Sequence, residues 1–266
     1  MNVSIIMPIY HPDRDLLEKI IKKVKSQKFS GKIEIIKVEK GLGLAASMNY
    51  GIKKAKSPIV VTLHQDCLPS SNLWLRNLVE PFKEKEVVCS VSKVHLPFDF
   101  WNKFDSVAKI LSSKEQKIIT PAMDEKGCAY KKTVLLKLRL FDDKNYRTAG
   151  EDLDMYLKLK KSGKIAYPNA EVLHFHKHTW KNRINKELQL ANSQGALTAI
   201  HKEMKGRYAG FFKALPILGY PLFIFSINPQ KLGISLSILA LPLYLLVNLI
   251  YSYGFWKGFL MKKQTI

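Results

Sequence analysis

The stretch VSIIMPIY, from Val3 to Tyr10, decides the fold. Its first part is apolar and rich in β-branched residues, and a proline and polar residues follow it, which is typical of a short buried strand. Three further runs of this kind follow along the chain, at Ile33 to Val38, Ile59 to Leu63 and Val87 to Val91. Because such runs are apolar on both faces, they predict strands of a parallel sheet.

Segments with helical spacing separate these runs. In Asp15 to Lys25 the apolar residues fall on one stripe, and Leu44 to Ala55 and Asn72 to Phe82 have the same spacing. Strands that alternate with helices indicate βαβ units. We therefore predict an α/β domain with an open sheet that helices cover on both faces.

Ligands bind such sheets at the carboxyl ends of the strands. The residues that follow the first three strands are Pro8-Ile9-Tyr10, Glu39-Lys40-Gly41 and His64-Gln65-Asp66. No G-x-G-x-x-G follows the first strand and no G-x-x-x-x-G-K-[ST] occurs, so a dinucleotide oxidoreductase and a P-loop enzyme are disfavoured.

Composition narrows the class of protein further. A chain of 266 residues has room for one large domain and an appendage, so we expect one active site. The net charge of +21 predicts attraction to phosphates of nucleotides, anionic lipids or nucleic acid. Nucleic acid is disfavoured as a partner because no RNP, helix-turn-helix or zinc-finger signature is present. Three cysteines without a C-x-x-C pair indicate a reducing compartment.

The C-terminal part has the composition of a membrane segment. Leu232 to Trp256 is an uncharged run of 25 residues, long enough to cross a hydrocarbon core of about 30 Å. Ala214 to Gln230 is also uncharged but carries Pro216, Pro221 and Asn228, so it is a short kinked span or a re-entrant segment. Residues 211–266 are thus expected to form one or two transmembrane helices, and a pair of buried core helices is the alternative.

Two boundaries follow from this organisation. Trp180 to Met204 has helical spacing with a basic face, so residues 179–210 are predicted as an amphipathic interfacial helix, with an ordinary surface helix as the alternative. Residues 1–178 form the predicted α/β domain. Basic residues flank the membrane segment on both sides, so a hairpin with both ends cytoplasmic satisfies the positive-inside rule, and the domain is expected on the cytoplasmic face of the cell membrane.

Four motifs in order give the chain a resemblance to a known family: Val3 to Tyr10, Gly43-Leu44-Ala45-Ala46-Ser47-Met48-Asn49-Tyr50-Gly51, Leu63-His64-Gln65-Asp66 and Gly150-Glu151-Asp152-Leu153-Asp154. The chain resembles the family 2 glycosyltransferases of GT-A fold, a Rossmann-like fold for nucleotide-diphospho-sugar transferases, over about residues 3 to 178. It is most similar to rhamnosyltransferase-like members that assemble polyprenyl-linked glycans. The Q-x-x-R-W signature of processive synthases is absent.

The resemblance implies a divalent cation, Mn²⁺ or Mg²⁺, bound by Asp66 and His174. The family usually has Asp where this chain has His64, so dependence on a metal is less strict than for a full D-x-D motif. His64 binds the cation or the nucleotide sugar, or it is a structural histidine at a strand end. Asp66 on its own also has a structural reading, as a turn residue before Pro69.

The resemblance also assigns residues to the donor, the base and the acceptor. Asp152 is the general base of an inverting displacement, with Glu151 beside it, and the dipole of the helix that they open is expected to keep Asp152 ionised. Two carboxylates at a helix N-terminus are also explained by the dipole alone. The acceptor side is assigned to Lys131, Lys132 and His176, the last also a second candidate for the cation, although solvated surface charges explain the two lysines equally well. Binding of the nucleotide sugar is assigned to Pro8, Tyr10, Glu39, Gly43, Asn49, His64 and Gln65.

These residues lead to a functional hypothesis. The protein is expected to be a membrane-anchored inverting glycosyltransferase that transfers a sugar from a nucleotide-diphosphate sugar to a lipid-linked acceptor. The acceptor is polyprenyl phosphate or a polyprenyl-linked saccharide, and anionic membrane lipids bind the basic surface. The alternative is a degenerate, non-catalytic scaffold or nucleotide-sugar-binding protein, because His64 replaces the usual acid.

Overall fold

The structure is a computed structural model, and it describes residues 1–113, 115, 124–146, 149–204 and 206–266. The chain divides into two compact units. The first consists of Met1–Pro97, Lys117–Asp143 and Glu151–His176, and the second of Phe98–Gln116, Lys144–Gly150 and Lys177–Ile266. This division differs from the expected boundary at residue 178, because two internal segments pack with the C-terminal helices.

A six-stranded sheet forms the centre of the first unit, in the order β2-β1-β3-β7-β5-β8. The predicted parallel arrangement is present for β1, β2 and β3. The four strands expected from the sequence form at or within one residue of the expected positions. The strands are β1 (Val3–Pro8), β2 (Ile33–Val38), β3 (Ile59–Leu63), β5 (Val87–Val91), β7 (Gly127–Lys131) and β8 (Lys164–Ala166).

The sequence did not predict β7. This strand lies between β3 and β5 and is antiparallel to both. Gly127 pairs with Leu63 and Lys131 pairs with Ile59, so β7 begins at the carboxyl end of β3. The residues just before β7 therefore lie at the edge of the sheet where ligands are expected.

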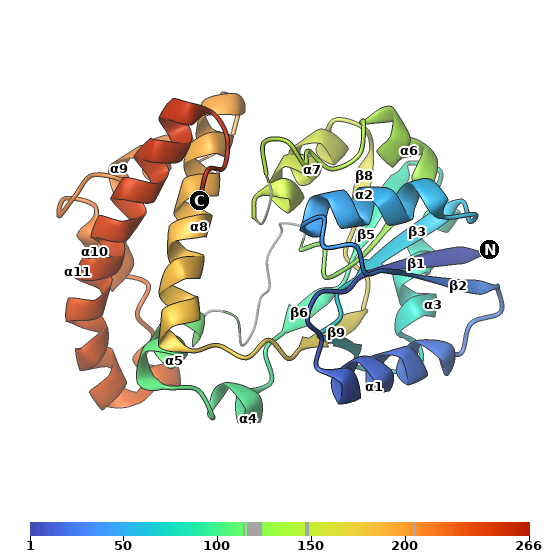
Figure 1. Cartoon of the computed structure of the whole chain (residues 1–266), viewed down its shortest axis with the longest axis horizontal. Helices are drawn as coiled ribbons and strands as arrows, with labels where there is room; N and C mark the ends of the chain where they lie inside the picture. The colour runs from blue at the N-terminus through green and yellow to red at the C-terminus, as the bar shows by residue number, and fades with distance from the viewer. Residues whose placement is uncertain (114, 116–123, 147–148, 205) are drawn as a thin grey trace. The chain divides into compact units, whose positions relative to one another are not determined.

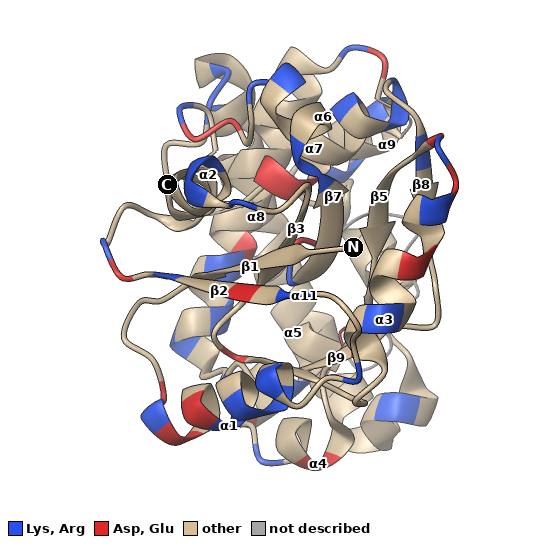
Figure 2. Cartoon of the chain, turned by 90° about the vertical axis from the view of Figure 1, so that its right-hand side faces the viewer, with Lys and Arg blue, Asp and Glu red and all other residues tan. Residues whose placement is uncertain are grey.

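Helices cover both faces of this sheet, as predicted (Figure 1). In β1 the side chains alternate: Ile5 packs on the side of α1 and α3, and Ile6 packs on the side of α2, α6 and α7. Figure 2 shows Lys and Arg on α1, α3 and α6. The helices are α1 (Arg14–Lys25), α2 (Leu44–Lys54), α3 (Trp74–Val79), followed by the 3₁₀ turn Glu80–Lys83, α6 (Lys132–Lys137) and α7 (Glu151–Lys160).

A second, three-stranded sheet in the same unit has the order β4-β9-β6. Its central strand is antiparallel to β4 and parallel to β6. This sheet matters for function because Cys67 in β4 pairs with His174 in β9. Its strands are β4 (Cys67–Pro69), β6 (Lys93–His95) and β9 (Glu171–His174).

The second unit is helical, and α8 and α11 lie side by side in it (Figure 1). Among the residues that the structure describes, α11 alone is long and apolar enough to cross a membrane. Residues 214–230 form turns, the five-residue α10 and the start of α11, so no helix of spanning length forms there. The helices are α4 (Phe98–Trp101), α5 (Ser106–Ser112), α8 (Trp180–Ile200), α9 (Arg207–Lys213), α10 (Tyr220–Ile224) and α11 (Pro229–Met261).

Candidate functional site

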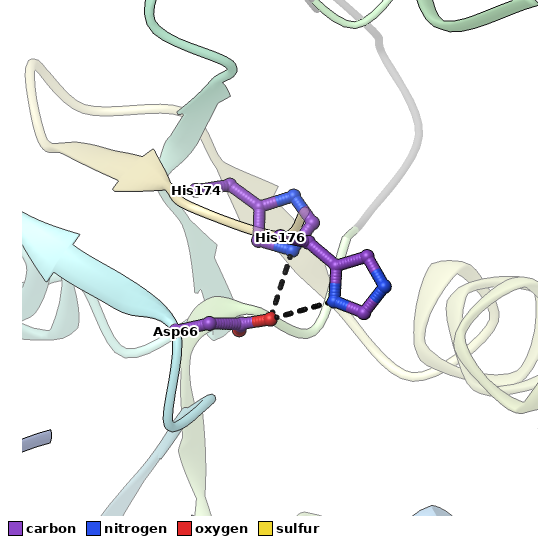
Figure 3. A group of neighbouring side chains, drawn as sticks. All are labelled: Asp66, His174 and His176. Atoms are coloured by element: carbon purple, nitrogen blue, oxygen red, sulfur yellow. Dashed lines mark hydrogen bonds and ion pairs between the residues drawn. The ribbon is translucent and has the colours of Figure 1, made fainter. Parts of the chain in front are cut away.

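Asp66, His174 and His176 form a cluster in the first unit (Figure 3). One carboxylate oxygen of Asp66, Oδ2, lies 3.4 Å from Nε2 of His174 and 3.1 Å from Nδ1 of His176. One ligand atom from each residue lies within 4.8 Å of the others. His174 is buried, whereas about half of the His176 side chain is exposed, so solvent reaches the cluster from one side.

The small sheet brings this cluster together. Asp66 directly precedes β4, and His174 ends β9, which pairs with β4. The pairing continues for one more residue, because the N–H of Phe175 donates to the carbonyl of Asp66 over 2.8 Å. Alternation along the chain then turns His174 and His176 to the same side. The two imidazole rings stack with their centroids 5.7 Å apart.

The electrostatics of the cluster keep Asp66 ionised. Burial acts to raise the pKa of Asp66, but the hydrogen bonds with His174 and His176 outweigh burial and hold that pKa well below its ordinary value. A carboxylate oxygen and two imidazole nitrogens are a ligand set that a first-row transition ion accepts, while Mg²⁺ prefers oxygen. The residues present therefore fit Mn²⁺ better than Mg²⁺.

His64 does not belong to this cluster. Its Nε2 lies 3.4 Å from Oε1 of Glu125, whose side chain is buried, and the His64 side chain is 13% exposed. Burial lowers the pKa of His64, although the charge of Glu125 opposes this effect, so the imidazole is neutral at neutral pH. This placement argues against one interpretation of His64, namely that it binds the cation directly together with Asp66.

Sequence reasoning missed the segment Asp124-Glu125-Lys126, which immediately precedes β7. The ammonium of Lys126 donates to both carboxylate oxygens of Asp124, over 2.9 and 3.1 Å. The hydroxyl of Thr62 in β3 donates to the carbonyl of Glu125 over 2.5 Å. The signal that would have found these residues is the antiparallel strand itself, because its start must lie where β3 ends.

Asp152 and Glu151 open α7, as the sequence indicated. The expected effect of the helix dipole on Asp152 was wrong in sign. Burial raises the pKa of Asp152 well above its ordinary value, and the negative charges of Glu125, Glu151 and Asp124 raise it further. Desolvation and three neighbouring carboxylates outweigh a partial charge of about half a unit at the helix terminus.

Gln65 holds the end of β1 in place. Its side-chain oxygen accepts from the N–H of Tyr10 over 2.7 Å, and its side-chain nitrogen donates to the carbonyl of Tyr10 over 2.8 Å. The Tyr10 side chain is 68% exposed, and its ring lies edge-on to that of His11. Pro8 ends β1 beside them. The first and third strands thus meet at the same edge, with an aromatic ring open to solvent.

The other residues assigned to the donor are placed differently. Glu39 is exposed just beyond β2, and Gly43 has the left-handed φ of 86° directly before α2, which an L side chain rarely adopts. Asn49 is buried, and its amide accepts from the N–H of Phe141 and donates to the carbonyl of Phe141 and to Asp143. The hydrogen bonds of Asn49 thus hold residues 141–143 in place, and its amide is engaged within the fold.

The structure does not bring Lys131 and Lys132 to the cluster. Lys131 ends β7 opposite Ile59, the first residue of β3, and therefore lies at the opposite edge of the sheet from Asp66. The Lys131 ammonium donates to the carbonyl of Lys85, and that of Lys132 to the carbonyl of Ala55, each over 2.5 Å. The antiparallel direction of β7 is the physical reason for this placement.

Comparisons with known proteins agree with this arrangement. Residues 12–138 match the model of glycosyl transferase family 2, and this match supports glycosyltransferase activity. Among solved structures, the chain is similar to the mannosyltransferase PcManGT from Pyrobaculum calidifontis, determined in complex with GDP-Man and Mn²⁺. That match has a TM-score of 0.63 and 15% identity, and it covers 98% of this chain and 88% of the other. It establishes likeness of the GT-A fold. No curated protein matches the chain.

Proposed function

We propose that the protein is an inverting glycosyltransferase that transfers a sugar from a nucleotide-diphosphate sugar to a lipid-linked acceptor. The observation that carries the proposal is the cluster of Asp66, His174 and His176 beside the carboxyl end of β3 in a family 2 domain. The similar mannosyltransferase binds GDP-Man and Mn²⁺, which supports a donor and a cation of these kinds here.

In this proposal Asp66, His174 and His176 hold a divalent cation, preferably Mn²⁺. When bound, the cation neutralises charge that develops on the leaving diphosphate. The chain's own residues bind the rest of the donor. Gln65 fixes the backbone of Tyr10, and the exposed ring of Tyr10 supplies a surface on which a nucleobase stacks. Glu39 and Gly43 complete the donor side at the end of β2.

Asp152 is the proposed general base. Its raised pKa means that the carboxylate binds a proton more strongly than an ordinary aspartate does, which favours proton transfer from the acceptor. Glu151 is 2% exposed beside it and keeps the proton affinity of Asp152 high through like charge. The two candidate acceptors differ here, since a sugar hydroxyl must lose a proton, whereas a phosphate monoester is already anionic.

The substitution Asp152→Asn separates these acceptors. With a polyprenyl-linked saccharide we expect turnover to fall by a factor of about 10² to 10⁴, the usual contribution of a general base. Near-normal turnover with polyprenyl phosphate would assign the phosphate as the nucleophile. Glu84→Gln, in an exposed ion pair with Lys164 in the same unit, serves as the control that leaves turnover unchanged.

The proposed anchor is α11, which supports an acceptor in a membrane, and we propose that the catalytic domain lies at the cytoplasmic face. Only 22% of its most apolar 18-residue stretch is buried, so most of that stretch is not covered by the rest of the described chain. An apolar helix with an uncovered face is stable in lipid. Lys257, Lys262 and Lys263 at its C-terminal end provide the positive charge that anionic lipid head groups bind.

The experiment that tests the function is a donor screen on the full chain in detergent. UDP-, GDP- and dTDP-sugars are supplied with Mn²⁺, Mg²⁺ or EDTA, with and without polyprenyl phosphate, and nucleotide release is measured. Release that depends on Mn²⁺ with one donor supports the proposal and identifies the sugar. If no donor is bound or turned over, the proposal fails and the alternative, a non-catalytic scaffold, replaces it. The presence of His64 in place of an acid favours that alternative.

A further inference from the structure

The buried pair of His64 and Glu125 is not used in the function proposed above. The Glu125 side chain is 5% exposed and that of His64 is 13% exposed. Among the described residues, neither Nε2 of His64 nor Oε2 of Glu125 has a hydrogen-bond partner, although Nε2 lies 3.4 Å from the other oxygen of Glu125. Leaving such buried polar atoms unsatisfied is costly, so a pair of them indicates a missing partner.

The register of the sheet places this pair at the reacting edge. Gly127 pairs with Leu63, so Glu125 lies two residues before this pair and His64 lies one residue after it. Asp66 follows His64 by two residues. Glu125 also contributes the largest effect of any single charged residue on the pKa of Asp152. Glu125 therefore lies at the same edge of the sheet as Asp66, and its charge acts on Asp152.

The chemistry of the pair selects the group that it binds. A carboxylate accepts hydrogen bonds and repels the oxygens of a diphosphate, so its ligand must offer an O–H or N–H donor. In a nucleotide-diphosphate sugar, hydroxyls are on the ribose and on the transferred sugar, at opposite ends of the diphosphate. A carboxylate beside the proposed base faces the sugar end, because the base acts where the sugar is transferred.

We propose that Glu125, oriented by His64, binds a hydroxyl group of the transferred sugar and thereby determines which sugar the enzyme accepts. This inference rests on the proposed function, because it assigns a partner to the same site. The oxygen Oε2 of Glu125 accepts the hydrogen bond from the sugar. His64 acts as a positioning residue that faces Oε1 and keeps the carboxylate in one orientation.

The test compares the binding of sugar nucleotides with that of the corresponding nucleoside diphosphates. UDP-glucose, GDP-mannose and dTDP-rhamnose, and then UDP, GDP and dTDP, are titrated calorimetrically into the full chain in detergent with Mn²⁺ held constant. For Glu125→Gln we expect the affinity for the bound sugar nucleotide to fall about tenfold or more, the usual loss for a hydrogen bond to a charged group. The affinity for its nucleoside diphosphate should stay unchanged.

A matched control uses another histidine–glutamate pair in the same unit. Glu171 lies 3.6 Å from His95, outside the site, and Glu171→Gln should change neither affinity. If Glu125→Gln lowers the melting temperature strongly, His64→Asn is the second variant. It removes the imidazole while Glu125 stays in place, and it should again weaken binding of the sugar nucleotide alone.

The inference is overturned if Glu125→Gln weakens both ligands equally, which would place Glu125 at the ribose or the cation, or if it weakens neither. Failure of the proposed function gives a different result. In that case the wild-type chain binds no sugar nucleotide at all, and the inference fails together with it.

Discussion

Asp152 is a residue whose ionisation costs the fold stability. Its pKa in the folded protein is raised by burial and by the carboxylates around it, while in the unfolded chain it returns to about 3.9. Above that pH the unfolded state binds fewer protons than the folded state, so stability falls as pH rises toward the folded pKa. The surroundings that raise the pKa of the proposed base therefore lower the free energy of unfolding at neutral pH.

We expect Asp152→Asn to raise the melting temperature by roughly 2–4 °C for each 1 kcal/mol of removed penalty. The gain should be larger at about pH 7 than at about pH 4, because Asp152 in the unfolded wild type is fully ionised at the higher pH and only about half ionised at the lower one. Differential scanning fluorimetry at the two pH values measures it. Asp154→Asn is the control with the opposite sign, since it breaks the ion pair of 2.5 Å between Asp154 and Lys158. A loss of stability in Asp152→Asn would contradict the explanation.

Asp66 is expected to determine binding of Mn²⁺ independently of turnover. Asp66→Asn removes the negative charge but keeps an oxygen, so we expect the affinity for Mn²⁺, measured by electron paramagnetic resonance, to fall about 10- to 100-fold. Asp15→Asn, exposed in the first turn of α1, should leave that affinity unchanged. Equal affinity in Asp66→Asn and the wild type would exclude the cluster as the cation site.

At the same scale, the sequence identified all three residues of the cluster. The family resemblance singled out Asp66 and His174 for the cation, and it gave His176 as a second candidate that was also assigned to the acceptor side. Glu125 was not identified, because its importance depends on the direction of β7. Nor was the state of Asp152, since two of the three carboxylates that act on it, Asp124 and Glu125, come from a segment that is distant in sequence.

The strands that the local sequence pattern predicted are those with long runs of β-branched residues, such as Ile59 to Leu63. β7 has the sequence GCAYK, with little β-branched character, and its direction is set by its neighbours β3 and β5. No local signal distinguishes a parallel from an antiparallel strand that is buried on both faces. The direction of β7 decides which of its two flanking segments reaches the site. Residues 124–126 lie at that edge of the sheet, and residues 131–132 lie at the opposite edge.

The contact between α8 and α11 gives a prediction at the scale of elements. A Cβ on Gly258 would lie 1.9 Å from the carbonyl oxygen of Asn192, and one on Gly195 would lie 1.9 Å from that of Phe255. Because backbone atoms are in the way, the helices must separate to admit a methyl group. We expect Gly258→Ala to destabilise the protein by about 1–3 kcal/mol, as overpacking usually does.

Thermal unfolding in detergent measures this effect, with Leu260→Ala as the control. Leu260 is 73% exposed on the same helix, so its truncation should change the melting temperature little. Because Gly258 belongs to the second unit and Asp66 to the first, Mn²⁺ affinity of the folded Gly258→Ala variant should be that of the wild type. Unchanged stability in Gly258→Ala would show that the helices do not pack this closely.

For the whole molecule, charge and apolar surface point to the same partner. The chain carries +21, and α11 leaves a stripe of aliphatic side chains exposed, among them Ile234 at 79% and Ile238 at 62%. Exposed apolar stripes of this length on a helix indicate contact with lipid or with another protein. With a basic chain, anionic lipid is the partner that satisfies both properties. We therefore expect binding to vesicles that contain anionic lipid to exceed binding to neutral ones and to weaken with salt.

The substitution Ile238→Lys separates the apolar part of that binding from the electrostatic part. An added positive charge would strengthen purely electrostatic binding, whereas a lysine in the hydrocarbon region costs about 3 kcal/mol relative to isoleucine, or about 100-fold in affinity. We expect vesicle co-sedimentation to show a loss of at least about tenfold, because the interface is less costly than the bilayer centre. Leu136→Lys adds the same charge on α6 in the other unit, at a position that is 47% exposed, and should preserve or strengthen binding. If both variants bind as tightly as the wild type, charge alone holds the chain to the vesicle and the stripe of α11 is not buried in lipid.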